Sequence, residues 1–385
     1  TVDLVVPARD DGDEDGGISG TRRDYFDIWA ARDDSKVKQI WSQVDGRPTF
    51  TTFHFLVLPV WFSDEDPNNP KNQMDIPRIK IILERNREYY RQMSQGTVDL
   101  SWTVLDQYQF KDVPGRSKMD VSKDAMRAYA TSIGYEFGDG SYDGMVLIYN
   151  IQRRGEHNFS GGVANVNGDD PFMWLSYALY DVDFGECIDY QVTRHEFGHN
   201  VGHGHHRAMA YERLGTQLYD GFDMMSGGNG YDVSDLHVAS KWFFGWVPHS
   251  SVVHLQPEGA TDWCPECVSS GTFEIVTFDD HTRPVKEGDV AGIHIPVHGE
   301  RGVQVYSYWL QYRTGNQGHA AGGLSVHLVW LTLGKTFGGS HSQLNYDVHG
   351  DTETTEDSFV LPGTCYVIEP ALVIAKRGLE GEKSS

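Results

Sequence analysis

The chain has 385 residues, of which 39% are hydrophobic and 12% aromatic, and 32 basic against 55 acidic side chains give a formal net charge of −23. This length exceeds one ordinary core, so we expect more than one domain. Nucleic acid and anionic membranes repel so acidic a chain, and neither is expected as a partner. No apolar run in the sequence is long enough to span a membrane, so no insertion is expected.

Residues 1–48 are polar and acidic, and we expect them to pack on the domain that follows or to extend it. Asp11, Asp13 and Asp15 match the first half of a calcium loop, but Arg22 stands where an EF-hand needs a bidentate glutamate. An EF-hand is excluded on this basis. A solvated acidic segment is favoured over a Ca²⁺ site of looser geometry.

Apolar periodicity over residues 49–249 predicts an α+β domain with a mixed sheet. A strand over 49–62 precedes a helix that Asp75 caps, Pro77 opens and Gly96 ends. A strand from Thr97, a helix over 122–133 and a strand from Tyr142 follow. Alternating strands and helices of this kind indicate a layered α/β arrangement.

The glycine-rich stretch GGVANVNG covers Gly161–Gly168 and allows two interpretations. It is either an ordinary loop or an exposed edge strand beside a cleft, to which an extended peptide could pair through main-chain hydrogen bonds. The second interpretation makes Gly162, Val163 and Ala164 candidate substrate-binding residues.

The segment HEFGHNVGHGHH places five histidines and one glutamate within His195–His206. On a helix, His195 and His199 lie on one face, and two neutral imidazoles at this spacing can bind one Zn²⁺ at about 2.0–2.1 Å. Glu196 stands beside the first ligand, where it can reach a water without binding the metal. This arrangement predicts a zinc site with Glu196 as general base.

A catalytic zinc needs a third protein ligand. Gly202 can end the helix in a left-handed conformation, after which the chain turns back and His205 can complete the site. His203 and His206 are the weaker alternatives, and both are more simply exposed polar side chains. The string His195, Glu196, His199, Gly202, His205 is far more specific than the short form alone.

This long string resembles the metzincin clan of zinc endopeptidases. The resemblance implies a methionine turn downstream, and FDMMSG supplies Met225, with Met224 as the alternative. Core packing would equally explain a methionine here. Gly227 stands where some members carry a tyrosine ligand, so no tyrosine switch is expected.

Within the clan the sequence is most similar to the gametolysin family of algal cell-wall-lysing enzymes, and less so to immune-inhibitor-A type peptidases. The stretches that carry the resemblance are EYYRQMSQGTVDL, HEFGHNVG, FFGWV, YWLQYR and GLSVHL. His203 replaces a residue that is usually apolar, and residues 1–48 have no counterpart. The likeness implies hydrolysis of extracellular or cell-wall proteins or glycoproteins.

Residues 250–385 change character, with short apolar runs broken by turn residues, and predict a β-sandwich-like domain. The domain boundary is expected near Val247–Val252, after a helix within 233–245. Cys187, Cys264, Cys267 and Cys365 allow two disulfides with three pairings. Because the chain begins at Thr1, we expect a processed, secreted form, although a truncated form would begin in the same way.

The sequence therefore predicts a secreted zinc endopeptidase, a metalloendopeptidase of metzincin type. Glu196 would take a proton from water and deliver it to the leaving amine. Two alternatives remain at this point: a catalytically latent scaffold that binds cell wall or matrix, and a zinc hydrolase that cleaves a non-peptide bond. An inactive copy has no need of Glu196, which argues against the first alternative.

Overall fold

The structure of the protein is a computed structural model, and for some residues of its helices and strands it describes the backbone alone. The described residues are 2–5, 43–44, 47–48, 51–62, 74–106, 108–110, 123–137, 140–149, 162–164, 172–176, 186–200, 206–208, 223–225, 235–255, 268–297, 304–314, 323–332, 341–343, 365–368 and 372–376.

The chain forms two compact units, and each is described by itself. The first, here called the helix–sheet unit, comprises Asp34–Ile40 and Thr49–His203. The second, here called the β-rich unit, comprises Thr1–Asp33, Trp41–Pro48 and Gly204–Ser385.

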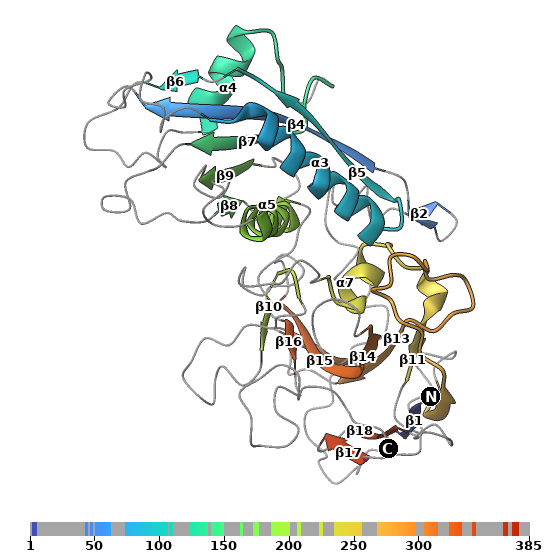
Figure 1. Cartoon of the computed structure of the whole chain (residues 1–385). Helices are drawn as coiled ribbons and strands as arrows, with labels where there is room; N and C mark the ends of the chain where they lie inside the picture. The colour runs from blue at the N-terminus through green and yellow to red at the C-terminus, as the bar shows by residue number, and fades with distance from the viewer. Residues whose placement is uncertain are drawn as a thin grey trace, which may run out of the picture. The chain divides into compact units, whose positions relative to one another are not determined.

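The helix–sheet unit contains a mixed sheet, as the alternation of predicted strands and helices indicates (Figure 1). Its strand order is β5-β4-β7-β9-β8, and β6 also pairs with β4. Only β8 runs antiparallel to its neighbour among these described strands. The strands are β4 (Thr51–Phe62), β5 (Val98–Val104), β6 (Tyr108–Phe110), β7 (Gly144–Tyr149), β8 (Gly162–Ala164) and β9 (Phe172–Ser176).

Helix α3 (Ile76–Met93) begins and ends where the sequence predicts. The Asp75 carboxylate accepts a hydrogen bond from the Arg78 amide at 3.0 Å and so caps the first turn. Pro77 lies in that first turn, where it has no intrahelical amide bond to lose. Gly96 follows the helix with a φ of 80°, a conformation that glycine adopts at little cost.

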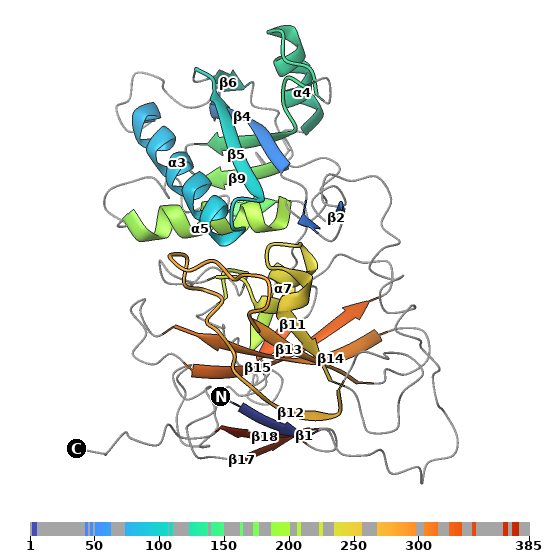
Figure 2. The ribbon, with the colours of Figure 1, turned by 90° about the vertical axis from the view of Figure 1, so that its right-hand side faces the viewer.

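Helices α3 and α5 (Glu186–Asn200) lie on one face of the sheet and α4 (Lys123–Ser132) on the other (Figure 2). Alternation along β4 explains this, because successive side chains of a strand point to opposite faces. Leu56 and Leu58 pack in a cluster with Met126 of α4. Phe55, which points the other way, contacts Phe197 of α5.

The β-rich unit contains two larger sheets and a two-stranded pair, β2 (Gln43–Val44) with β3 (Arg47–Pro48). The order of one sheet is β12-β1-β18-β17, formed by Ser270–Phe273, Val2–Val5, Leu372–Lys376 and Cys365–Ile368. The order of the other is β10-β16-β15-β14-β13-β11, formed by His206–Ala208, His341–Gln343, Gly323–Thr332, Gln304–Arg313, Gly292–Val297 and Val252–His254. The sandwich arrangement stays a prediction.

The division between the two compact units falls at His203–Gly204, and the domain boundary expected near Val247–Val252 stays a prediction. Strand β10 pairs with β16, and α7 (Val238–Phe243) packs on β13 and β14, so the segment after His203 belongs with the β-rich unit. The packing expected for residues 1–48 likewise stays a prediction. Val2–Val5 pairs with β12 and β18 rather than with the sheet of the helix–sheet unit.

The helix expected within 233–245 is shorter than its apolar pattern indicates, because α7 begins only at Val238. A short 3₁₀ helix, η5 (His249–Ser251), follows it. Among the residues that the structure describes, no helix is both long and apolar enough to cross a membrane.

Candidate metal centre

The last turns of α5 carry the three residues around which the sequence predicts a zinc site. His195, Glu196 and His199 are each only 5% exposed. The imidazole rings of His195 and His199 are 4.8 Å apart between centroids, with their planes at 90°. The helix therefore places two buried imidazoles one turn apart, with a buried carboxylate beside them.

Aromatic packing fixes α5 against the sheet. The Phe197 ring is fully buried, and its centroid lies 5.0 Å from that of Phe55 on β4 and 4.7 Å from that of Trp102 on β5. Because Phe197 directly follows Glu196 in the helix, this anchoring also restricts where Glu196 can lie.

Two hydrogen bonds hold the same helix at both ends of the motif. The hydroxyl of Tyr90 on α3 donates to the carbonyl of Arg194 at 2.7 Å. The side-chain amide of Asn200 donates to the carbonyl of Phe172 on β9 at 3.1 Å. Both contacts are buried, where a hydrogen bond has no competition from water.

Glu196 lies against the edge strand β8. The Ala164 amide donates a hydrogen bond to its carboxylate, and the Gly162 Cα faces its side chain so closely that a Cβ there would lie 2.4 Å from Glu196 Cγ. Burial raises the pKa of Glu196 to about 8, although the Ala164 hydrogen bond acts in the opposite direction. A carboxyl group with such a pKa can both accept and release a proton near neutral pH.

The residues on α5 fit a zinc ion. Zinc in proteins takes imidazole nitrogen readily, and catalytic sites use three protein ligands. The Oε2 atom of Glu196 is buried and has no hydrogen-bond partner in the described part of the chain, so it is available to a proton donor. No cluster of three ligand-type side chains occurs among the described residues, and His205, the predicted third ligand, lies outside them.

Within the segment Gly161–Gly168, Gly162–Ala164 forms strand β8 rather than a loop, while its role as a substrate-binding strand beside a cleft stays a prediction. This strand ends the strand order and pairs antiparallel with β9, Val163 opposite Trp174. In the described part of the sheet, its other side has no neighbouring strand.

Met224 and Met225 lie in the β-rich unit in a buried turn, 3% and 0% exposed. The Asp223 carboxylate accepts a hydrogen bond from the Met225 amide at 2.6 Å and lies 2.5 Å from His237 Nε2. Met224 and Met225 therefore lie in a tightly held turn. Its role beneath a metal ion stays a prediction.

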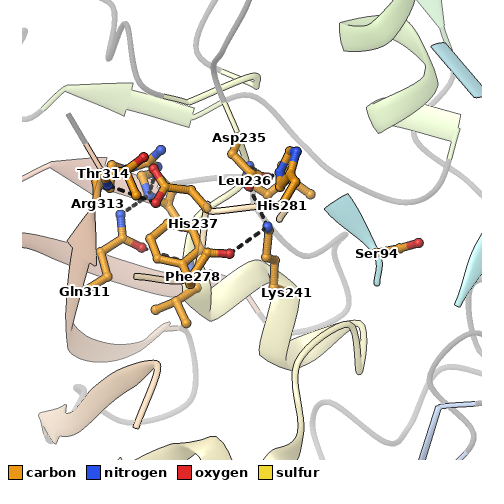
Figure 3. Close-up of polar contacts among 12 residues, drawn as sticks. Ser94, Asp235, Leu236, His237, Lys241, Phe278, His281, Gln311, Arg313 and Thr314 are labelled. Carbon is orange, nitrogen blue, oxygen red and sulfur yellow. Dashed lines mark hydrogen bonds and ion pairs between the residues drawn. The ribbon is translucent and has the colours of Figure 1, made fainter. Parts of the chain in front are cut away.

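Buried polar groups around α7 connect that turn to the sheet of β14 and β15. Figure 3 shows His237 near Gln311 and Arg313 of β14. The Gln311 Oε1 atom accepts a hydrogen bond from the Val238 amide, and its Nε2 atom donates to His237 Nδ1 and to His327 Nε2. We therefore assign the proton of His237 to Nε2, facing Asp223. Gln311 supplies the helix-capping acceptor for α7 from a distant strand, which no local pattern indicates.

A second buried group on α7 is an ion pair. Lys241 Nζ lies 2.5 Å from Asp235 Oδ2, and His281 Nε2 lies 3.0 Å from the same oxygen (Figure 3). Both partners of the ion pair are at most 2% exposed. Sequence reasoning missed these residues and also Tyr90, since only tertiary contacts reveal their partners.

Several sequence predictions concern residues or side chains outside the described part of the chain. These are the calcium candidates Asp11, Asp13 and Asp15, the third-ligand candidates His203, His205 and His206, and the side chains of Cys187, Cys264, Cys267 and Cys365. The roles of these residues stay predictions.

Comparison with known proteins gives structural likenesses of low score. No protein-family model and no curated protein matches the chain. Metalloproteinase-II from Bacteroides fragilis is 11% identical with a TM-score of 0.29, and the match covers 55% of this chain and 59% of that one. Catalytically inactive OgpA from Akkermansia muciniphila, solved with an O-glycopeptide substrate, is 10% identical with a TM-score of 0.32, covering 77% of this chain and 93% of that one.

Wild-type OgpA is 13% identical with a TM-score of 0.32 at the same coverage. The chain thus spans 59% of the length of the Bacteroides protein. At these scores we interpret the chain from its own residues.

Proposed function

We propose that the protein is a zinc-dependent endopeptidase. The observation that carries this proposal is the position of Glu196, which is buried beside His195 and His199 on α5 and lies against the edge strand β8. A general base that lies next to two histidines and against a strand with no further neighbour in the described part of the sheet suits the hydrolysis of a peptide bond.

His195, His199 and His205 would hold one zinc ion. When bound there, zinc supplies a Lewis acid that polarises a carbonyl and lowers the pKa of water. Glu196 accepts a proton from the attacking water and delivers it to the leaving amine nitrogen, for which its raised pKa is suited. Met225 would form an apolar floor beneath the imidazoles.

The outer side of β8 would hold the substrate. An extended peptide that adds to a sheet edge forms main-chain hydrogen bonds, which orient its carbonyl without demanding a particular side-chain sequence. Gly162, Val163 and Ala164 would provide these groups, except for the Ala164 amide, which donates to the Glu196 carboxylate. The proposed substrates are extracellular or cell-wall proteins and glycoproteins, in keeping with the sequence resemblance to the gametolysin family.

The remaining features belong to the same proposal. Residues 49–249 would form the catalytic domain of metzincin type and residues 250–385 a β-sandwich-like domain, in a secreted protein stabilised by disulfides. A Ca²⁺ site at Asp11, Asp13 and Asp15 is the weaker alternative to a solvated segment.

The proposal is tested by incubating the protein with a diverse peptide mixture and identifying new termini by mass spectrometry. Cleavage should require zinc, stop on addition of a chelator and fall by several orders of magnitude in Glu196→Ala, which should still bind zinc. Near-wild-type cleavage by this variant would overturn the assignment of Glu196. A wild-type protein that binds one zinc ion and cleaves nothing would instead favour a latent, wall-binding scaffold.

The third ligand is tested by zinc content. His205→Ala should reduce zinc occupancy, and His206→Ala is the matched control. If occupancy survives the first substitution and falls with the second, His206 is the ligand instead.

A further inference from the structure

Strand β8 crosses Glu196 so closely that any side chain at position 162 would have to displace the Glu196 side chain. A Cβ atom there would lie 2.4 Å from Glu196 Cγ, 2.7 Å from Oε1 and 2.8 Å from Cδ, whereas real Cβ atoms essentially never approach other heavy atoms within 3.0 Å. The φ of Gly162 lies outside the left-handed region, so its backbone conformation does not require glycine. The three heavy atoms nearest to that Cβ position all belong to the Glu196 side chain.

The same short strand also binds the Glu196 carboxylate. The Ala164 amide donates a hydrogen bond to it, and α5 packs against β8 along this stretch. Gly162 and Ala164 are two residues apart, so their Cβ positions lie on one face of the strand and their amides point to one edge of it. One supplies the space for the carboxylate and the other supplies its hydrogen-bond donor.

We propose that Gly162 and the Ala164 amide are positioning groups that hold the Glu196 carboxylate in place. This inference rests on the proposed function and deepens it. A strand that only paired with substrate would need main-chain groups, which every residue provides. The absence of a side chain at position 162 is needed for a different purpose, which is to let the base lie directly under the strand.

Thermal unfolding tests the close approach without any need for activity. Gly162→Ala should lower the Tm by about 2–4 °C or more in the wild-type background and by a similar amount in Glu196→Gln, which has the same shape. In the Glu196→Ala background the obstructing atoms are gone, so the same change should leave the Tm unchanged or raise it. An equal loss in all three backgrounds would overturn the proposal.

Amide hydrogen exchange at Ala164 tests where the carboxylate lies. Glu196→Ala removes the acceptor, and exchange at this amide should rise roughly tenfold. Gly162→Ala should produce the same rise, because it displaces the carboxylate while leaving both partners present. Glu196→Gln retains an acceptor oxygen and should keep most of the protection. Unchanged exchange in Gly162→Ala would show that Glu196 has not moved and would refute the inference.

Kinetics then separate positioning from substrate binding. A displaced base should lower kcat on the order of 10²-fold, with KM changed less than about threefold and zinc content unchanged. A rise in KM with kcat preserved would assign Gly162 to substrate binding instead. If the wild-type protein cleaves no peptide, the proposed function fails, whereas the unfolding and exchange measurements still decide whether β8 holds Glu196.

Discussion

Replacing Phe197 by alanine should destabilise the helix–sheet unit strongly, because this side chain joins α5 to the sheet. Phe197 is 0% exposed, and burying a phenylalanine contributes about 1.5–3 kcal/mol. Its contacts with Phe55 and Trp102 add about 0.5–1.5 kcal/mol per aromatic pair, and the cavity left behind adds more. We therefore expect Phe197→Ala to lower the free energy of unfolding by about 3–5 kcal/mol.

The assay is equilibrium denaturation followed by tryptophan fluorescence, with Phe197→Leu as the matched control. Leucine keeps much of the buried volume and should cost less than half as much as alanine. Because α5 also carries the proposed zinc ligands His195 and His199, the alanine variant should lose zinc at lower denaturant concentrations than the wild type. A loss below about 1.5 kcal/mol for alanine, or an equal loss for leucine, would refute the packing argument.

Three further predictions concern buried polar contacts. Tyr90→Phe removes the hydrogen bond to the Arg194 carbonyl and should cost about 0.5–1.5 kcal/mol of unfolding free energy by chemical denaturation. Asp235→Asn leaves the Lys241 ammonium buried without its counter-ion and should cost about 3–5 kcal/mol, most of which Asp235→Leu combined with Lys241→Met should recover. Burial would raise the pKa of Asp235, but Lys241 and His281 hold it at about 2, below the value of about 3.9 in an unfolded chain. The contribution of Asp235 is therefore complete above about pH 4 and lost as the pH falls towards 2, a decline that acid titration of Asp235→Asn should not show.

The sequence by itself determined the features that depend on neighbours along the chain. The Asp75 cap, Pro77 and the apolar spacing between them and Gly96 are local signals, and α3 forms where they predict. The spacing of His195 and His199 likewise requires only one turn of helix to bring two imidazoles together. Such signals are visible in sequence because the interacting groups lie three or four residues apart.

Contacts between distant segments were decided only by the tertiary structure. The apolar pattern before Gly245 predicts a longer helix, but α7 begins only at Val238. There the side chain of Gln311 on β14 accepts a hydrogen bond from the first amide of the helix. The N-terminal strand Val2–Val5 pairs with Leu372–Lys376 near the other end of the chain.

Position 162 also shows the difference between what the local sequence indicates and what a contact with a distant segment decides. The sequence marks β8 as glycine-rich, but the reason for Gly162 is the Glu196 side chain, which a different element brings within 3 Å of where a Cβ would lie. Local periodicity reports which face of a strand or helix is apolar. It cannot report which side chain of another element will lie against that face, because this contact joins segments that are far apart in the sequence and depends on how they pack in the folded chain.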